Sequence, residues 1–135
     1  KQPVEESKKW EETFKLKPLE VGSILLLKNM FFKFDSEELI EASKPEISRI
    51  SNLLKANKNI KIAIVGHTDD LGNDTYNITL SKNRANTIKL ALENLGISPK
   101  RINTIGEGEN KPLVPNTSEE NRAKNRRTEL KILDI

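Results

Sequence analysis

The sequence predicts an α/β (α+β) two-layer sandwich with the order βαβαβ(α)β, in which the helices pack on one face of a mixed sheet. Residues 60–66 form a short, almost continuous apolar run, as expected of a buried central strand. A helical pattern over residues 75–95 separates this run from a second strand-like segment at residues 101–105. Strands joined through a helix run parallel with right-handed crossovers, so the helices should cover the same face of the sheet.

Composition limits the classes of protein to which this chain could belong. Its 135 residues suit one hydrophobic core, and the longest apolar run, residues 24–27, is far shorter than the ~20 residues of a membrane-spanning helix. We therefore expect one domain that does not insert into a membrane. The absence of cysteine excludes disulfides and any cysteine-based zinc site or nucleophile. The net charge is only +3 and aromatic residues make up 4%, so nucleic acid is not an expected partner.

The first strand and the first helix are predicted downstream of a polar N-terminal segment. Residues 1–22 are expected to be a linker or lead-in, with a short strand where Phe14–Lys17 alternates, and residues 23–135 to be the folded domain. β-Branched and aromatic residues predict a strand over Ser23–Phe34. The run SKPE at residues 43–46 is a capping box, so a helix should begin there. The chain has no initiator methionine, so we expect it to be part of a longer protein.

The second half of the chain carries signals for a helix end, a loop and a closing strand. Gly96 stands where the long helix should stop, because glycine readily adopts the left-handed conformation that follows a helix. Glycines and prolines predict a loop over residues 106–118, and its GEG run is expected to be a turn because the third glycine of a dinucleotide fingerprint is missing. A helical turn at residues 119–124 and a strand at 127–133 follow. Their short connection indicates that the last strand runs antiparallel.

The helix predicted over residues 75–95 has an inner face that is polar in its first turns and apolar afterwards. Asn77, Ser81 and Arg84 lie on the same inner arc as the apolar side chains. A buried arginine must be paired or hydrated. Arg84 therefore either forms a salt bridge with a neighbour or faces a ligand. The apolar side chains fall within an arc of about 120°: Leu80, Ile88, Ala91, Leu92 and Leu95.

The position of this polar face favours a ligand. It lies at the N-terminal end of the helix, where free N–H groups attract anions. It also follows the carboxyl end of the strand at residues 60–66, next to the crevice where open α/β sheets bind ligands. Asp69 lies in the same loop, so a carboxylate and the Arg84 guanidinium would face one crevice. Such a pair suits a zwitterionic ligand.

Other charged residues carry weaker signals. His67 is the only histidine, and the sequence offers neither cysteine nor a GxSxG motif, so we expect it to be hydrogen-bonded within its loop rather than catalytic or metal-bound. Arg122, Arg126 and Arg127 lie near the last strand and are expected at a solvated sheet edge. Alternation along this strand puts Arg126 on the same face as Thr128, so Arg126 should point into the domain.

Several motifs together resemble one known family. The stretch GHTDDLGNDTYNITLSKNRA at residues 66–85 resembles the pattern GHTD-x2-G-x4-N-x2-LS-x2-RA of OmpA-like peptidoglycan-binding domains. NRRTEL at residues 125–130 is similar to the closing NRR strand of that family. FKFD at residues 32–35 resembles its first strand, and GEGENKP at 106–112 resembles its glycine-rich turn. The likeness covers residues 24–133 in the expected order and spacing.

The resemblance implies a fold that holds diaminopimelate, the third residue of the peptidoglycan peptide stem in most Gram-negative bacteria. Asp69, at the motif position, would bind the ammonium group of the diaminopimelate side chain, and Arg84 would bind its carboxylate. No catalytic residue, metal or cofactor is implied. The other residues that the resemblance places in or beside the pocket are Phe34, Asp35, Asn77, Leu80 and Arg126.

The resemblance further implies non-covalent anchoring of a larger periplasmic protein, either a lipoprotein or a protein associated with the outer membrane. Other parts of that protein would contact other envelope proteins. Two alternatives stay open: a peptidoglycan-processing enzyme, for which only a carboxylate pair could serve, and a protein–protein interaction module that uses the arginine cluster. One departure is Asn121, which precedes Arg122 where the family usually has glycine. Asparagine also tolerates the left-handed conformation, so the turn should be kept.

Overall fold

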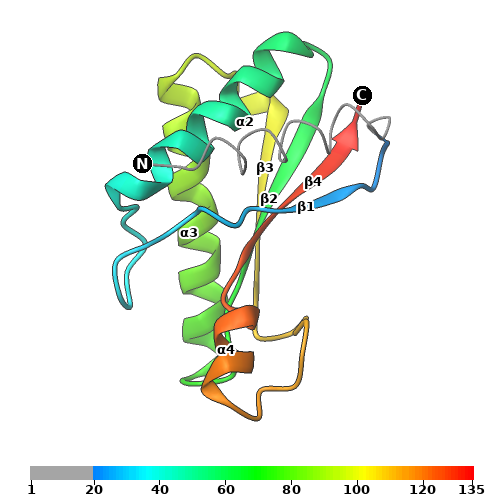
Figure 1. Ribbon diagram of the computed structural model, residues 1–135. Coiled ribbons are helices and arrows are strands. Elements are labelled where there is room, and N and C mark those ends of the chain that lie inside the picture. The colour runs from blue at the N-terminus through cyan, green and yellow to red at the C-terminus, as the bar shows by residue number, and fades with distance from the viewer. Residues whose placement is uncertain (1–19) are drawn as a thin grey trace.

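The computed structural model describes residues 20–135, in which a four-stranded mixed sheet carries α2 and α3 on one side (Figure 1). The strand order is β1-β4-β2-β3, with β2 parallel to β3 and β4 antiparallel to both β1 and β2. This α+β arrangement confirms the predicted fold class and the antiparallel last strand. The elements are β1 (Ile24–Leu26), η1 (Glu41–Ser43), α2 (Lys44–Ala56), β2 (Lys61–His67), α3 (Asp74–Asn94), η2 (Pro99–Arg101), β3 (Ile102–Gly108), α4 (Glu119–Asn125) and β4 (Thr128–Asp134).

The hydrophobic core lies between the sheet and the two long helices. Along β4, Thr128, Leu130 and Ile132 are buried while Glu129 and Lys131 are half-buried, which confirms the predicted alternation. Each fully buried aliphatic side chain contributes roughly 1.5–3 kcal/mol relative to an exposed one, so this layer dominates stability. The largest core side chains with almost no exposure are Ile50, Leu54, Ile60, Ile62, Ile64, Ile88, Leu92, Ile102, Leu130 and Ile132.

The segment before α2 differs from its prediction. The strand ends at Leu26 rather than Phe34, and residues 28–40 form turns held by an isolated bridge between Phe32 and Leu39. The Ser43 hydroxyl accepts from the Phe31 N–H at 2.7 Å and donates to its carbonyl at 2.9 Å. The helix begins where predicted, but the predicted capping box is not formed. The Ser43 side chain bonds to the backbone of Phe31 instead of capping the first turn of α2.

Glycines bring α3 unusually close to the sheet. A Cβ atom at Gly106 would lie 2.5 Å from the Lys82 nitrogen, and one at Gly66 would collide with the Ser81 carbonyl. Only glycine permits this approach. The first half of α3 therefore packs directly against the carboxyl ends of β2 and β3. Residues 106–108, expected to be a turn, instead form the end of β3.

The ends of the later helices depend on local hydrogen bonds. Helix α3 stops at Asn94, and Gly96 has φ of 99°, which confirms the predicted stop signal. Leu95 was expected on the inner face but is exposed. Asn121 does not form a left-handed turn, because it lies within α4, where the Ser118 side chain accepts its N–H.

Two further predictions concern the lead-in segment and the arginine cluster beside β4. The short strand expected at Phe14–Lys17 lies outside the described residues. The Gly22 N–H donates to the Ile132 carbonyl at 2.8 Å, so the chain already contacts β4 there. Strand β4 has neighbours on both sides, so the solvated edge expected for the arginine cluster is wrong. The side chain of Arg127 is instead largely covered and donates to Glu129.

Candidate binding site

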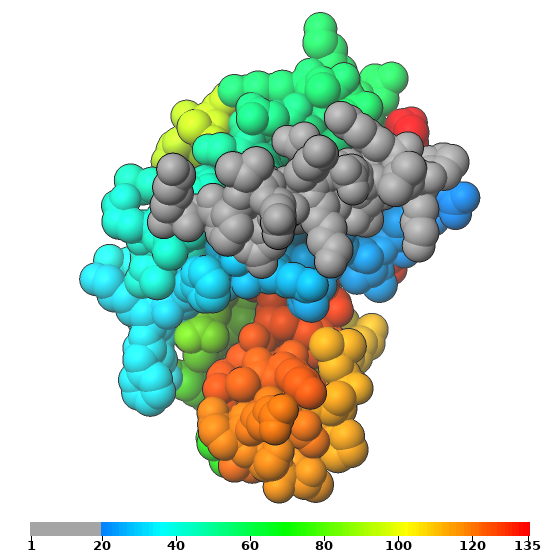
Figure 2. All heavy atoms as spheres, in the orientation of Figure 1, coloured from blue at the N-terminus to red at the C-terminus, as the bar shows by residue number. Residues whose placement is uncertain are grey.

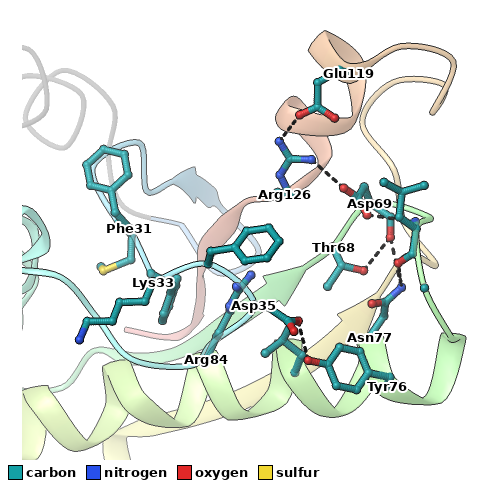
Figure 3. Close-up of a pocket in the computed structure, with 16 residues that line it drawn as sticks. Phe31, Lys33, Asp35, Thr68, Asp69, Tyr76, Asn77, Arg84, Glu119 and Arg126 are labelled. Carbon is teal, nitrogen blue, oxygen red and sulfur yellow. Dashed lines mark hydrogen bonds and ion pairs between the residues drawn. The ribbon is translucent and has the colours of Figure 1, made fainter.

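A pocket of about 820 Å³ lies beyond the carboxyl end of β2. Figure 2 shows the hollow between the segment around residues 30–40, in cyan, and α4, in orange, with part of α3 in green behind it. Its position is the crevice expected of an open α/β sheet. The structure brings all the predicted site residues together around this pocket (Figure 3): Phe34, Asp35, Asp69, Asn77, Leu80, Arg84 and Arg126.

Asp69 is buried, with 7% of its surface exposed, and both of its carboxylate oxygens have partners. Oδ1 accepts from the Leu71 N–H at 3.0 Å, and Oδ2 accepts from Nη1 of Arg126 at 2.7 Å. The carboxylate at the motif position is therefore ion-paired before any ligand arrives.

Arg126 joins the loop after β2 to helix α4. Its Nη1 contacts Asp69, and its Nη2 donates to Oε2 of Glu119 at 2.7 Å (Figure 3). The hydrogen bond to Glu119 raises the pKa of Arg126 most, and the hydrogen bond to Asp69 raises it further. The contact with Arg126 in turn lowers the pKa of Glu119. Arg126 lines the pocket but keeps 38% of its side chain exposed, whereas Arg127 is the covered arginine, so the prediction that Arg126 points into the domain is wrong. Glu119 was not predicted, and no periodicity in the sequence indicates it.

Arg84 lies half-buried on α3 and holds the other wall of the pocket. Its Nε donates to the Ser36 carbonyl at 2.8 Å, and its guanidinium lies 5.0 Å from the centre of the Phe32 ring. Burial lowers the pKa of Arg84, while the Asp35 charge opposes this effect. Within residues 20–135, Arg84 forms no salt bridge, and its two Nη atoms donate to no described residue. The internal salt bridge considered for Arg84 is not found there.

Asp35 is held opposite Arg84 by a residue that the sequence patterns did not single out. The Tyr76 hydroxyl donates to Oδ1 of Asp35 at 2.6 Å. The signal for Tyr76 was available, because Tyr76, Leu80 and Arg84 are spaced four residues apart and so form one row along the helix. Asp35 has φ of 50°, in the left-handed region.

The remaining predicted residues contribute in different ways. The Asn77 side chain is buried and donates to the Leu71 carbonyl at 2.9 Å, so it holds the loop in place. Leu80 is half-buried beside Arg84. Phe34 is 98% exposed and thus contributes nothing to the core. These residues surround the pocket, and their part in ligand binding stays a prediction.

His67 lies outside the pocket. It is buried at the end of β2, and its Nε2 lies 2.8 Å from Oε1 of Glu129 on β4, so the expected partner within its own loop is wrong. Burial and the nearby Arg127 lower the pKa of His67. Among residues 20–135, no group of three or more potential ligands is placed to hold a metal ion. Within the same range, no helix has both the length and the apolar character needed to cross a bilayer.

A comparison with family models identifies one family for this chain. The family model described as "OmpA family" matches residues 31–126. Outer membrane porin F of Pseudomonas aeruginosa is 36% identical over 75% of this chain and 29% of its own length. The peptidoglycan-associated lipoprotein of Buchnera aphidicola subsp. Baizongia pistaciae is 33% identical over 73% of this chain and 57% of its own length.

The architecture is shared with solved structures as well. The periplasmic domain of MotB from Helicobacter pylori superposes with a TM-score of 0.73, at 27% identity, over 87% of this chain and 80% of that chain. The chain spans less than two thirds of the two curated relatives. Together with the sheet order and the motif residues gathered at one pocket, these matches confirm the resemblance. The chain belongs to the OmpA family.

Proposed function

We propose that this domain binds the peptide stem of peptidoglycan without catalysis and thereby anchors a larger envelope protein to the cell wall. One observation carries the proposal: the Nη atoms of Arg84 have no hydrogen-bond partner among residues 20–135, and they lie in the same pocket that Asp35 and Asp69 line. A pocket with both signs of charge suits a ligand that carries both signs on neighbouring atoms.

The side chain of diaminopimelate is such a ligand, because it ends in an ammonium and a carboxylate on one carbon atom. The free guanidinium edge of Arg84 binds the carboxylate through charge-assisted hydrogen bonds. Asp69 binds the ammonium beside its existing contact with Arg126. Phe34 and Leu80 contact the methylene groups between the two ends of the diaminopimelate residue.

The relatives support an association with peptidoglycan and a periplasmic location. One is a peptidoglycan-associated lipoprotein, one an outer membrane porin, and one a periplasmic domain. We infer that this domain lies in the periplasm as part of a larger lipoprotein or outer-membrane protein. Other envelope proteins would be met by the rest of that protein.

The enzyme alternative needs a carboxylate pair, and the pocket offers Asp35, Asp69 and Glu119. Asp69 and Glu119 share Arg126 as their cation, and the pKa of Glu119 is lowered. The lowered pKa favours the ionised form of Glu119, whereas a hydrolase of this type requires one carboxyl group that stays protonated near neutral pH. The contacts therefore favour binding over hydrolysis.

Calorimetric titration with two tripeptide stems tests the proposal. A stem with meso-diaminopimelate should bind in the roughly micromolar to millimolar range. A stem with lysine lacks the carboxylate that Arg84 binds, and losing such a hydrogen-bonded pair, worth about 1.5–3 kcal/mol, should weaken binding ten- to a hundredfold. Equal affinity for the two stems would contradict the role given to Arg84.

A sedimentation assay with purified sacculi distinguishes a binding module from an enzyme and from a protein–protein interaction module. A binding module sediments with sacculi and releases no muropeptides, whereas an enzyme releases them. A protein–protein module would sediment poorly, or would sediment equally well after Asp69→Asn and Arg84→Gln. Either result would contradict the proposal.

A further inference from the structure

Asp35 combines a strained backbone with a carboxylate that forms no salt bridge within residues 20–135. It is the only residue other than glycine with positive φ in residues 20–135. Aspartate tolerates this region better than most residues, but glycine fits it more easily. The side chain at this position therefore has a use that outweighs the strain, or a contact that offsets it.

The charges of the pocket single out Asp35. The carboxylates that line it are Asp35, Asp69 and Glu119, and the last two are ion-paired with Arg126. Asp35 forms no ion pair with any described residue, and its Oδ2 accepts no hydrogen bond from residues 20–135. In the free domain, Asp35 is thus the pocket carboxylate whose charge is still available to a cation.

Tyr76 fixes the orientation of this carboxylate. Its hydroxyl is 2.6 Å from Oδ1 of Asp35, a short bond between a neutral donor and a charged acceptor. The Tyr76 side chain belongs to the pocket rather than the core, with 47% of its surface exposed. Figure 3 shows its ring reaching from the start of α3 toward Asp35 on the facing loop. The bond raises the pKa of Tyr76, as expected of a phenol beside a carboxylate.

Helix α3 holds the facing loop at two points. Tyr76 contacts Asp35, and Arg84, eight residues later and about 12 Å along the axis, contacts the Ser36 carbonyl. The ammonium and the carboxylate of a zwitterionic ligand would thus both meet groups that α3 orients.

We propose that Tyr76 is a positioning residue for the ammonium end of the ligand, acting by holding the Asp35 carboxylate toward it. This inference rests on the proposed function of the pocket. Tyr76 itself need not touch the ligand, because its effect passes through Asp35.

A double-mutant cycle with Tyr76→Phe and Asp35→Asn tests the inference. Tyr76→Phe keeps the ring and removes only the hydroxyl. It should weaken binding of the diaminopimelate stem about three- to tenfold in the parent. In the Asp35→Asn background the same change should have almost no effect. A stem acetylated on the side-chain amine should bind the parent and the Tyr76→Phe variant equally, since its cation is gone.

The hydrogen bond has a second readout that needs no ligand. Tyr76 is the only tyrosine of the chain, so an alkaline absorbance titration reports this one phenol. Asp35→Asn should lower its pKa toward the usual value for tyrosine.

The outcomes distinguish this inference from the proposed function. If the parent binds no stem, the proposed function fails and the inference fails with it. If the parent binds but Tyr76→Phe binds equally well, or weakens binding to the same extent with and without Asp35, only the inference is overturned. An unchanged tyrosine pKa in Asp35→Asn would also overturn it.

Discussion

Replacing Asp69 tests whether the anionic contact of the pocket can be separated from the fold. In Asp69→Ala, the Leu71 N–H and one end of Arg126 lose their acceptor. A hydrogen bond to a charged group contributes about 1.5–3 kcal/mol. Arg126 is 38% exposed in its side chain and keeps Glu119. Solvent therefore replaces part of the loss, and we expect the free energy of unfolding to fall by about 1–3 kcal/mol.

The isosteric variant Asp69→Asn should behave differently. Its side-chain oxygen still accepts the Leu71 N–H, so the free energy of unfolding should fall by less than about 1 kcal/mol. The charge that attracts an ammonium is gone, so binding of the diaminopimelate stem should weaken about ten- to a hundredfold. Urea unfolding and calorimetric titration on the same samples measure the two effects.

Ile64→Ala serves as the control for the scaffold. Ile64 is fully buried on β2, so truncation should lower the free energy of unfolding by about 2–5 kcal/mol. The folded fraction should still bind the stem as the parent does. The reasoning fails if folded Asp69→Asn binds the stem as tightly as the parent. An Asp69→Ala variant with parental stability would show that the contact with Arg126 does not persist in solution.

Other predictions address the core, the histidine and the exposed aromatic residue. Gly106→Ala would force a Cβ atom to 2.5 Å from the Lys82 nitrogen and 2.7 Å from the Ile78 carbonyl oxygen, so it should destabilise the domain by about 1–3 kcal/mol in urea unfolding; a neutral result would mean that α3 moves away freely. The pKa of His67 is lowered in the folded state, so the unfolded chain takes up this proton more readily. Stability should therefore be complete above about pH 6.5 and decline as the pH falls below it, by at most about 1.4 kcal/mol per pH unit, and this slope should vanish in His67→Gln. A slope of the same size in the variant would place its origin elsewhere. The free energy of unfolding of Phe34→Ala should lie within about 0.5 kcal/mol of that of the parent, because the ring is 98% exposed. The variant should nevertheless sediment less with sacculi, and undiminished sedimentation would show that Phe34 is not part of the site.

Elements with strong periodicity were predictable from the sequence alone. The strand predicted at residues 60–66 is β2 at Lys61–His67, and the helix predicted at 75–95 is α3 at Asp74–Asn94. Local signals sufficed there, because a continuous apolar run and a glycine stop act through neighbouring residues only. The inner face predicted for α3 was wrong at two positions. Ala85 lies in the core although it was not assigned to that face, whereas Leu95 was assigned to it and is exposed.

The site was only partly predictable, because its ion pairs join distant segments. Asp69 and Arg126 are 57 residues apart, and Tyr76 and Asp35 are 41 apart. Periodicity placed Arg84 on an inward stripe and the family motif named Asp69, but neither pattern shows that Asp69 is already neutralised. That fact bears on the proposed site, since a ligand ammonium there would have to share Asp69 with Arg126.

The position of the left-handed residue could not be predicted without knowing the contacts that each candidate residue makes in the folded domain. The sequence placed such a residue at Asn121, whereas the structure has it at Asp35. Asparagine and aspartate have similar intrinsic tolerance for this conformation, so propensity does not separate the two positions. At Asn121 the Ser118 side chain accepts the backbone N–H and keeps the residue in the first turn of α4. At Asp35 the Tyr76 hydroxyl holds the carboxylate from the other side of the pocket. The backbone turn around Asp35 is closed by the Ser36 N–H, which donates to the Lys33 carbonyl at 3.1 Å. Each position thus depends on its own hydrogen bonds, and only at Asp35 does a side-chain partner belong to the pocket.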